Sequence, residues 1–308
     1  MWSHVCKDEV KIADICDELL AVGCNDGWLY LFDEDGVLWT EKLSVTFYRD
    51  PYTDVQITAL DVNERHLAVG TNFMDGKLYL FSREGDLLWK QQFMTVASIG
   101  ERPEDVTSVS VGDRYVGAGA GWIDEFIYIY DISGNRVLER AVDGAVRGIA
   151  LRENRIAFGT ERKLYIVRPI SKEVDVCVKE LMFLKDELVV SEEKGLLVLS
   201  DDYDELFRVT MRRPEIYVDE GREVIAAVDE DLLQVISPSG EILWRAKVPV
   251  RPLSVFVEDE VYLGFPGRIM VLSEDRKREV KLDGEPICIG RLGVAVKKEN
   301  SISLMELP

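Results

Sequence analysis

The chain repeats itself along almost its whole length, and internal repetition constrains the fold more than any other feature of a sequence. Residues 20–39 read LAVGCNDGWLYLFDEDGVLW, and residues 67–89 read LAVGTNFMDGKLYLFSREGDLLW. Related stretches cover residues 115–138 and 224–244, and weaker copies begin near residues 155, 187, 260 and 292. One position of the repeat recurs about every 39 residues, at Tyr30, Tyr79, Tyr128, Tyr165, Leu197, Gln234, Met270 and Ser303.

Each copy has the residue pattern of short strands separated by turns. Its apolar runs are short, carry Val, Ile, Leu, Tyr and Phe, and are broken by Gly, Asp, Asn or Ser. No helical period of 3.6 residues is sustained. In the second copy we expect strands at residues 55–62, 66–70, 77–81 and 87–93, which we name a to d. Four strands in about 40 residues, repeated many times, predict the blades of a β-propeller.

The count of blades follows from the two ends of the repeat. Seven copies have all four strands, whereas the last copy, at residues 292–307, has only three. Residues 2–5 supply the missing strand, because Trp2 precedes Trp39 in the same register. We therefore expect a single all-β domain over residues 1–308, an eight-bladed β-propeller closed by its N-terminal strand. A seven-bladed ring is the alternative, if the copy at residues 179–211 packs irregularly.

Two recurring residues have structural explanations. The turn between strands c and d reads Asp/Ser-x-x-Gly, in which a side-chain acceptor opens the turn and glycine supplies a positive φ; the four glycines are Gly36, Gly85, Gly134 and Gly240. Tryptophans at one position of strand d, namely Trp39, Trp89 and Trp244, predict packing between blades and not an aromatic cage, since a binding site needs no copy in every blade.

The first two copies, at residues 21–39 and 68–89, bring a family resemblance. The motif Ala-Val-Gly-x-x-Asp-Gly-x-Leu-Tyr-x-Phe-Asp-x-x-Gly-x-x-Leu-Trp resembles the quinoprotein-type (PQQ-like) propeller repeat, and the Gly-His and Trp-Asp pairs of WD repeats are missing. That family contains cofactor-dependent dehydrogenases and cofactor-free scaffolds. The chain has no adjacent Cys–Cys pair and no extra acidic segment for calcium, so the resemblance implies the scaffold branch, without a cofactor. The matching residues of the first copy are Ala21, Val22, Gly23, Asp26, Gly27, Leu29, Tyr30, Phe32, Asp33, Gly36 and Trp39.

Charge and composition exclude several partners and sites. A net charge of −20 opposes binding to nucleic acid or to anionic lipid, and no apolar run is long enough for a membrane helix. Residues 1–11 show no secretory signal, and five cysteines are too sparse for a disulfide framework, so we expect a reducing cytoplasm. Only 10 of 308 residues are Asn or Gln, a bias that indicates a thermophile.

Metal chemistry has little support in the sequence. His4 and His66 lie far apart, and the cysteines form no C-x-x-C pair. The acidic runs at residues 33–36 and 201–205 complete no calcium loop, so we interpret them as solvated turns. We expect no metal site, although ring closure would bring Cys6, Cys16 and Cys24 near one another and leaves an incidental metal or disulfide open.

The residues that break the repeat carry the functional prediction. In a propeller the d–a and b–c connections emerge on one face, and in the first three copies these connections are long and aromatic. Loops of this composition resemble the core of a protein interface; the alternative is that the aromatics fold back over the blades. The residues predicted to bind a partner are Trp28, Phe47, Tyr48, Arg49, Tyr52, Phe73, Met74, Trp122 and Phe126.

Cations gather on the same face of the later copies. On an acidic protein they could attract an anion at the mouth of the central channel; the alternative is ion pairing with nearby Asp and Glu. The candidate anion-binding residues are Arg147, Arg162, Arg212, Arg213, Arg251 and Arg268.

These observations predict a non-catalytic scaffold that presents a rigid loop face to a protein partner, either alone or within a multi-subunit assembly. The alternative is an enzyme or sensor that binds an anionic small molecule at the channel mouth. A third class is a purely structural subunit, which would bury its flank and not its loop face.

Overall fold

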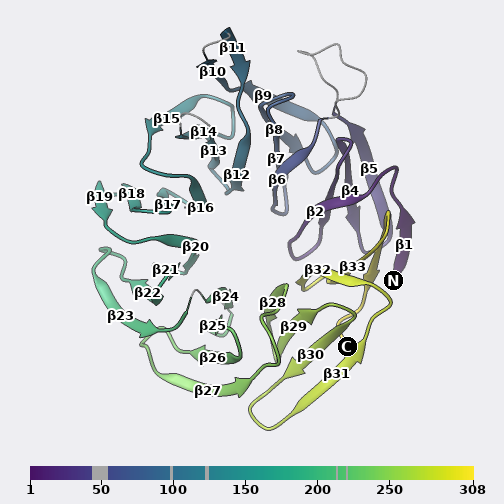
Figure 1. Cartoon of the computed structure of the whole chain (residues 1–308), viewed down its shortest axis with the longest axis vertical. Helices are drawn as coiled ribbons and strands as arrows, with labels where there is room; N and C mark the ends of the chain where they lie inside the picture. The colour runs from purple at the N-terminus through teal and green to yellow at the C-terminus, as the bar shows by residue number, and fades with distance from the viewer. Residues whose placement is uncertain (44–54, 98–99, 122–124, 213, 220) are drawn as a thin grey trace.

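The chain forms a closed ring of β-sheets (Figure 1). A computed structural model describes residues 1–43, 55–97, 100–121, 125–212, 214–219 and 221–308. Over these residues every regular element is a strand, and eight four-stranded antiparallel sheets follow one another around the axis. The prediction of an eight-bladed propeller is therefore confirmed. The copy that the sequence left in doubt forms a regular fifth blade.

Within each blade strand a lies next to the axis and strand d lies on the rim (Figure 1). Blades 1 to 4 contain β2 (Val10–Ile15), β3 (Leu20–Cys24), β4 (Trp28–Asp33), β5 (Gly36–Lys42); β6 (Ile57–Val62), β7 (His66–Thr71), β8 (Lys77–Ser82), β9 (Leu87–Gln92); β12 (Val106–Val111), β13 (Tyr115–Ala120), β14 (Phe126–Asp131), β15 (Arg136–Ala141); and β16 (Val146–Arg152), β17 (Arg155–Thr160), β18 (Leu164–Arg168), β19 (Lys172–Val174). Blades 5 to 8 contain β20 (Val178–Leu184), β21 (Glu187–Glu192), β22 (Gly195–Leu199), β23 (Glu205–Thr210); β24 (Glu215–Asp219), β25 (Val224–Val228), β26 (Leu232–Ile236), β27 (Ile242–Lys247); β28 (Ser254–Val257), β29 (Val261–Phe265), β30 (Arg268–Leu272), β31 (Lys277–Lys281); and β32 (Glu285–Gly290), β33 (Gly293–Lys298), β34 (Ser301–Met305), β1 (Trp2–Val5).

The N-terminal strand closes the ring as expected. β1 pairs antiparallel with β34, with Trp2 opposite Leu304 and Val5 opposite Ser301. The Trp2 ring stacks on Phe32 of blade 1, with centroids 4.5 Å apart. The first and last strands of the chain therefore share blade 8, and this blade packs on blade 1 by the same kind of contact that joins other neighbours.

The core lies between the blades. The described side chains of strands b and c are buried almost throughout, whereas strand d alternates between half-buried and exposed positions. Close contact is possible because strand b is rich in glycine: a Cβ added at Gly23 would lie 2.7 Å from Cγ2 of Ile57 in the next blade. Burial of apolar side chains at these seams supplies most of the stabilisation of such a ring.

The strand-d tryptophans join neighbouring blades, as the repeat predicts. The indole Nε1 of Trp39 donates a hydrogen bond to the carbonyl of Arg83 in the next blade (2.9 Å), and that of Trp89 donates to Ile132 (2.8 Å). Trp2 makes the equivalent bond to Asp33 (2.9 Å). The c–d turn glycines also adopt the positive φ expected of them.

Among the described residues no helix is long and apolar enough to cross a membrane.

Candidate protein-binding face

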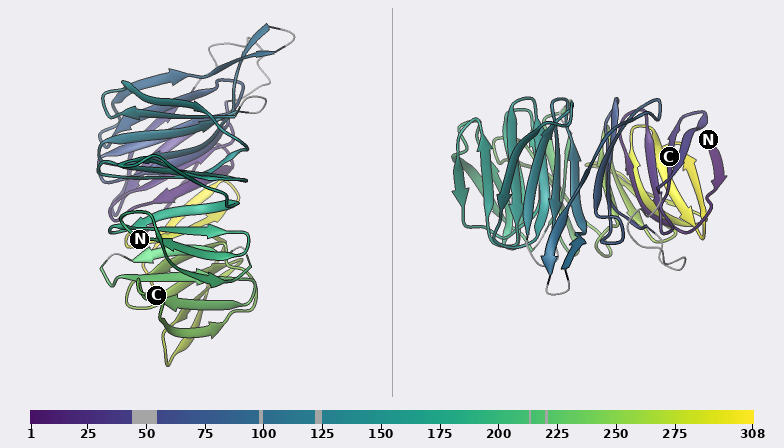
Figure 2. Two further views of the ribbon diagram at one scale, coloured as in Figure 1. Left: turned by 90° about the vertical axis from the view of Figure 1, so that its left-hand side faces the viewer. Right: turned by 90° about the horizontal axis from the view of Figure 1, so that it is seen from above.

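The long connections of the first three blades lie on the d–a/b–c face, the face on which strand d leads to the next strand a and strand b leads to strand c. Between blades 2 and 3 the connection folds into a two-stranded hairpin, β10 (Met94–Ala97) and β11 (Gly100–Pro103). Figure 2 shows this hairpin projecting beyond the ring on one side. From blade 3 onward the d–a connections are short; β15 of blade 3 ends at Ala141 and β16 of blade 4 begins at Val146.

At the base of the hairpin lies the b–c loop of blade 2, residues 72–76. Its form is fixed by its own backbone, because the carbonyl of Asn72 accepts hydrogen bonds from the amides of Asp75 (2.9 Å) and Gly76 (2.7 Å). The amide of Phe73 donates to Oδ1 of Asp105, at the start of blade 3 (2.7 Å). The loop thus holds the Phe73 side chain 48% exposed on a backbone that is tied to two blades.

An ion pair lies beneath this loop. Nζ of Lys77 contacts Oδ1 of Asp75, and both side chains are almost fully buried. Oδ2 of Asp75 accepts hydrogen bonds from the hydroxyls of Tyr79 (2.5 Å) and Thr71 (3.3 Å). Burial, together with this bond and the charge of Asp75, raises the pKa of Tyr79, so the phenol stays a donor. A buried carboxylate with this many partners holds the loop rigidly.

The loop also packs against the chain that leads into and out of the hairpin. The amide of Phe93 donates to the carbonyl of Gly76 (2.9 Å), and the amide of Glu104 donates to the carbonyl of Phe93 (3.1 Å). Gly76 has φ +59°, and a Cβ there would lie 2.5 Å from Cβ of Pro103. We call residues 72–76, Phe93 and residues 103–105 the Phe73 platform.

The predicted partner-binding residues in the described part of the chain divide into three environments. Phe73 is exposed, whereas Met74 is only 7% exposed and belongs to the interior of the loop. Phe126 is half-buried and stacks on Tyr128 (5.9 Å), which in turn stacks on Phe93 (4.4 Å), so it joins the aromatic packing beside the Phe73 platform. The remaining aromatic and arginine candidates of this set, Phe47, Tyr48, Arg49, Tyr52 and Trp122, lie outside the described residues.

Trp28 shows a related arrangement in blade 1. It is half-buried, and Nζ of Lys42 lies 5.8 Å from the centroid of its ring. The same lysine pairs with Asp26 (2.9 Å), the residue that corresponds to Asp75 in the repeat. Blade 1 therefore brings its cation from strand d, whereas blade 2 brings it from the start of strand c.

Sequence reasoning missed the supports of the Phe73 platform. Asp75, Lys77 and Asp105 hold the loop, yet only the aromatic tips were singled out. A signal was present: Lys77 stands where the first copy has an apolar residue, Trp28, and a charged residue in that place needs a buried partner.

The candidate anion-binding arginines in the described part of the chain all pair with carboxylates. Arg162 contacts Asp143 (2.6 Å), Arg212 contacts Glu230 (3.0 Å), and Arg268 contacts Glu279 (3.1 Å). The other described ones contact glutamates as well, Arg147 with Glu161 and Arg251 with Glu215. Arg213 lies outside the described residues.

Two of these arginines line the channel mouth on the d–a/b–c face. Strand a has a bulge in six blades. The residue left unpaired at the bulge is Arg147 in blade 4 and Lys179 in blade 5. With Arg251 they line a pocket of about 630 Å³ that also contains glutamates. On strand a of blade 5, burial and the charge of Glu215 raise the pKa of Glu180 to about 7.

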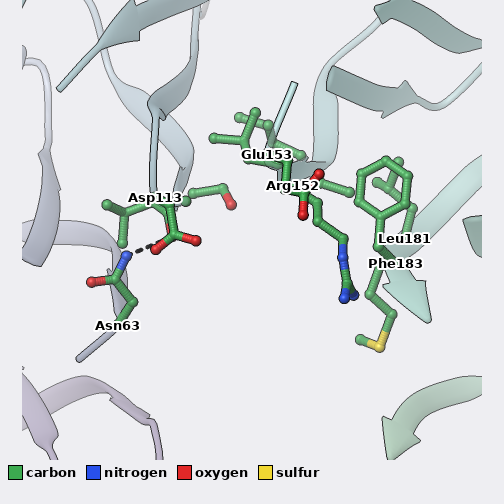
Figure 3. A pocket seen from close by; sticks show the side chains of 13 residues that line it. Asn63, Asp113, Arg152, Glu153, Leu181 and Phe183 are labelled. Carbon is green, nitrogen blue, oxygen red and sulfur yellow. Dashed lines mark hydrogen bonds between the residues drawn. The ribbon is translucent and has the colours of Figure 1, made fainter. Parts of the chain in front are cut away.

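A second pocket, of about 440 Å³, lies beside the a–b turns of blades 2 to 4 (Figure 3). Asn63, Asp113, Arg152, Glu153, Leu181 and Phe183 are among its lining residues. Near it, Oδ2 of Asp61 accepts a hydrogen bond from the amide of Val111 in the next blade (2.6 Å), and Oδ2 of Asp14 accepts one from Val62 (2.9 Å). Burial raises the pKa of both carboxyls. They link neighbouring strands a of blades 1, 2 and 3.

Within the described residues no group of three or more His, Cys, Asp or Glu side chains is arranged to hold a metal ion.

Comparisons with known proteins support the fold. Searches with the sequence match no protein family and no curated protein. Among solved structures, BamB from Moraxella catarrhalis is 12% identical, with a TM-score of 0.71 over 100% of this chain and 97% of that one. The C-terminal WD40 domain of Sif2 is 11% identical, with a TM-score of 0.71 over 99% and 97%. Apo AztD from Citrobacter koseri is 13% identical, with a TM-score of 0.63 over 91% and 87%. At these identities the likeness shows a β-propeller and no more.

Proposed function

We propose that the protein is a non-catalytic scaffold that binds a protein partner on the d–a/b–c face of blades 1 to 3. The observation that carries the proposal is Phe73, a large apolar side chain held half exposed on a backbone fixed by Asp105 and by a buried ion pair. The buried network fixes the backbone that carries Phe73, so this exposed side chain is already positioned before a partner binds. Such a surface loses little conformational entropy when a partner binds.

The ring explains how this face is presented. Each blade is fixed by its two neighbours, and closure by β1 leaves no free end in the ring of blades. The Phe73 platform, which includes the base of the hairpin, therefore keeps one position on the ring. A partner that contacts it meets a surface that is already ordered.

The experiment compares two exposed apolar residues at different places. Purified wild type, Phe73→Ala and Leu243→Ala are used as baits in the native extract; Leu243 is 46% exposed on the rim strand β27 of blade 6. We expect a protein that is captured by wild type and by Leu243→Ala and lost with Phe73→Ala, with unchanged melting temperatures. Its affinity is then measured with purified components, where Phe73→Ala should weaken binding at least tenfold.

Equal capture by Phe73→Ala and wild type would contradict the proposed face. Loss of capture with Leu243→Ala alone would favour a structural subunit that binds through its rim.

The channel mouth supports a second candidate, a site for an anionic small molecule, because Arg147, Lys179 and Arg251 line one pocket. Lys179 and Arg251 both contact Glu215, so an anion must displace a carboxylate to bind. Thermal-shift titration with phosphate, citrate and a dinucleotide tests it. Stabilisation that Arg147→Ala abolishes would support this function over the scaffold.

A further inference from the structure

The strands on the rim of the ring are sheet edges, and in most blades that edge is irregular or short. In blades 1, 2, 3, 5 and 6 the register between strands c and d shifts, so β5, β9, β15, β23 and β27 each pair irregularly. The edge strands of blades 4 and 8, β19 and β1, have only three and four residues. Bulges and short strands keep an exposed sheet edge from pairing with another chain.

Blade 7 keeps a regular edge. β31 pairs with β30 over five residues without a shift of register, from Lys277 opposite Leu272 to Lys281 opposite Arg268. Figure 1 shows β31 on the outer rim, and among the described strands it has a neighbour on its inner side alone. The amides and carbonyls that point outward from β31 can therefore pair with an added strand.

β31 also differs from the other edge strands in its charge. Residues 274–279 are exposed without a break. The five residues of β31 hold three cations and one carboxylate, that of Glu279. Arg278 takes the register position that Trp244 has in blade 6, so an exposed guanidinium replaces a seam tryptophan. This positively charged strand lies on a chain whose net charge is −20.

The charges of β31 are only partly neutralised. On one face of the strand lie Lys277, Glu279 and Lys281, because alternate residues of a strand share a face. Glu279 contacts Arg268 of β30 (3.1 Å) and is 3.9 Å from Lys277. Within the described chain, the cations of this part of the rim that have no ion pair are Arg245 and Lys247 of β27, Arg276 and Lys281. The edge of blade 7 is thus left with excess positive charge.

We propose that β31 binds an extended acidic segment of another protein, which adds to blade 7 as a fifth strand. Hydrogen bonds between the backbone of the segment and the outer edge of β31 supply the pairing. Carboxylates on alternate residues of the segment lie opposite the face that carries Lys277 and Lys281, and opposite charges on paired strands attract. This site is on the rim of blade 7 and does not depend on the Phe73 platform in blade 2.

The chemistry of the edge selects this occupant over two others. In a second copy of the chain, pairing of β31 with β31 would place cations opposite cations, which destabilises a sheet. A nucleic acid has no row of amides and carbonyls to pair with a strand, and the net charge of −20 repels its phosphates. An acidic peptide segment satisfies both the backbone of β31 and its side chains.

The test uses the purified full chain and a labelled peptide of about seven residues that alternates Glu and Val. Fluorescence anisotropy at ~0.15 M salt should show saturable binding. The same peptide N-methylated at every residue, which lacks backbone donors, should bind at least about tenfold more weakly, and so should a peptide with Lys in place of Glu. Hydrogen exchange should slow in residues 277–281 when the Glu peptide is bound, and stay unchanged in β9.

Two double variants of equal net charge locate the site. Lys277→Glu with Lys281→Glu should weaken binding of the Glu peptide at least about tenfold. Lys7→Glu with Lys90→Glu is the matched control, because both lysines are exposed, lie away from blade 7 and have no ion pair among the described residues. This control should bind the peptide as wild type does, and both variants should keep the melting temperature of wild type.

Several results would overturn the proposal. Equal binding of the N-methylated and parent peptides would show attraction by charge without an added strand. Absence of peptide binding, or equal weakening in the two double variants, would exclude β31 as the site. Tighter binding of an oligothymidylate than of the Glu peptide would assign the edge to nucleic acid. A dimer in sedimentation velocity that protects residues 277–281 from exchange would assign it to a second copy. None of these results bears on capture of a partner by Phe73.

Discussion

Blades 1 to 3 and blades 4 to 8 are built from the same four-stranded sheet, yet they end differently on the d–a/b–c face. In blades 1 to 3 this face carries a projecting hairpin, a buried ion pair and an exposed phenylalanine above it. In blades 4 to 8 the connections are short and carry surface ion pairs, such as Arg212 with Glu230 and Arg162 with Asp143.

The two regions differ in whether their ion pairs are buried or exposed. A surface ion pair is solvated on both sides and contributes little to stability, so its residues can change freely. A buried pair cannot lose one member without leaving an uncompensated charge, so its presence commits the surrounding loop to one conformation. The buried Asp75–Lys77 pair lies directly under the loop that exposes Phe73.

The largest effect is expected at the buried pair. Asp75→Ala removes the buried carboxylate that Lys77 contacts and should lower the free energy of unfolding by about 3–5 kcal/mol. Urea unfolding followed by tryptophan fluorescence measures it. The double variant Asp75→Asn, Lys77→Met should recover most of the loss, since no charge remains. A loss below about 1 kcal/mol for Asp75→Ala would show that the pair is solvated.

Equivalent glycines in the two regions sharpen the comparison. Gly76 in blade 2 and Gly267 in blade 7 both occupy b–c turns at positive φ, +59° and +73°. Alanine at Gly267 meets nothing within 4 Å and should cost about 1 kcal/mol from backbone strain alone. Alanine at Gly76 would also press on Pro103 and should cost about 2–4 kcal/mol. Equal losses in urea unfolding would mean that the loop and the base of the hairpin separate easily.

Glu180 gives blade 5 a stability that depends on pH. Its pKa is raised to about 7 in the folded protein, so folding favours its protonated form. The stability that goes with protonated Glu180 is fully present below the unfolded pKa near 4.5. It is lost as the pH rises through the folded pKa of about 7. Glu180→Gln mimics the protonated form and should gain about 2 kcal/mol over wild type at pH 8. The gain should vanish near pH 4; a constant difference across that range would contradict the assignment.

The smallest effect is expected at the exposed pairs. Arg212→Ala breaks its contact with Glu230 and should change the free energy of unfolding by less than about 1 kcal/mol, with less change still at 0.5 M salt. Differential scanning calorimetry of this variant beside Asp75→Ala measures the contrast directly. A loss as large as that of Asp75→Ala would erase the distinction between the two regions.

The propeller fold could be predicted from the sequence, because the pattern of each repeat indicates its own strands and turns. The Trp2 register indicated closure, and the turn glycines indicated the turns, because backbone geometry alone requires those residues. The Phe73 platform was only partly predictable. Its aromatic tip stands out from the repeat, but Asp105 reaches Phe73 across a hairpin and a blade boundary, and no local pattern encodes a contact of that kind.

Burial was also beyond the sequence at some positions. Met74 and Phe73 are adjacent loop residues with similar hydrophobicity, yet one lies inside the loop and the other points to solvent. The side of the loop that faces inward depends on the turn formed around Asn72, whose carbonyl accepts two amides. The cations of blades 4 to 8 likewise contact carboxylates that are distant in the sequence, such as Arg251 with Glu215. The sequence alone does not say which charges pair.

Closure of the ring by β1 sets the order in which the protein can be completed during synthesis. β1 is synthesised about 300 residues before its partner β34, so it waits for its hydrogen bonds while the rest of the ring is made. During that wait Trp2 and the open edges of the growing arc of blades are available to other chains. Translation speed and chaperone occupancy should therefore influence the yield of this protein more than the stability of any single blade.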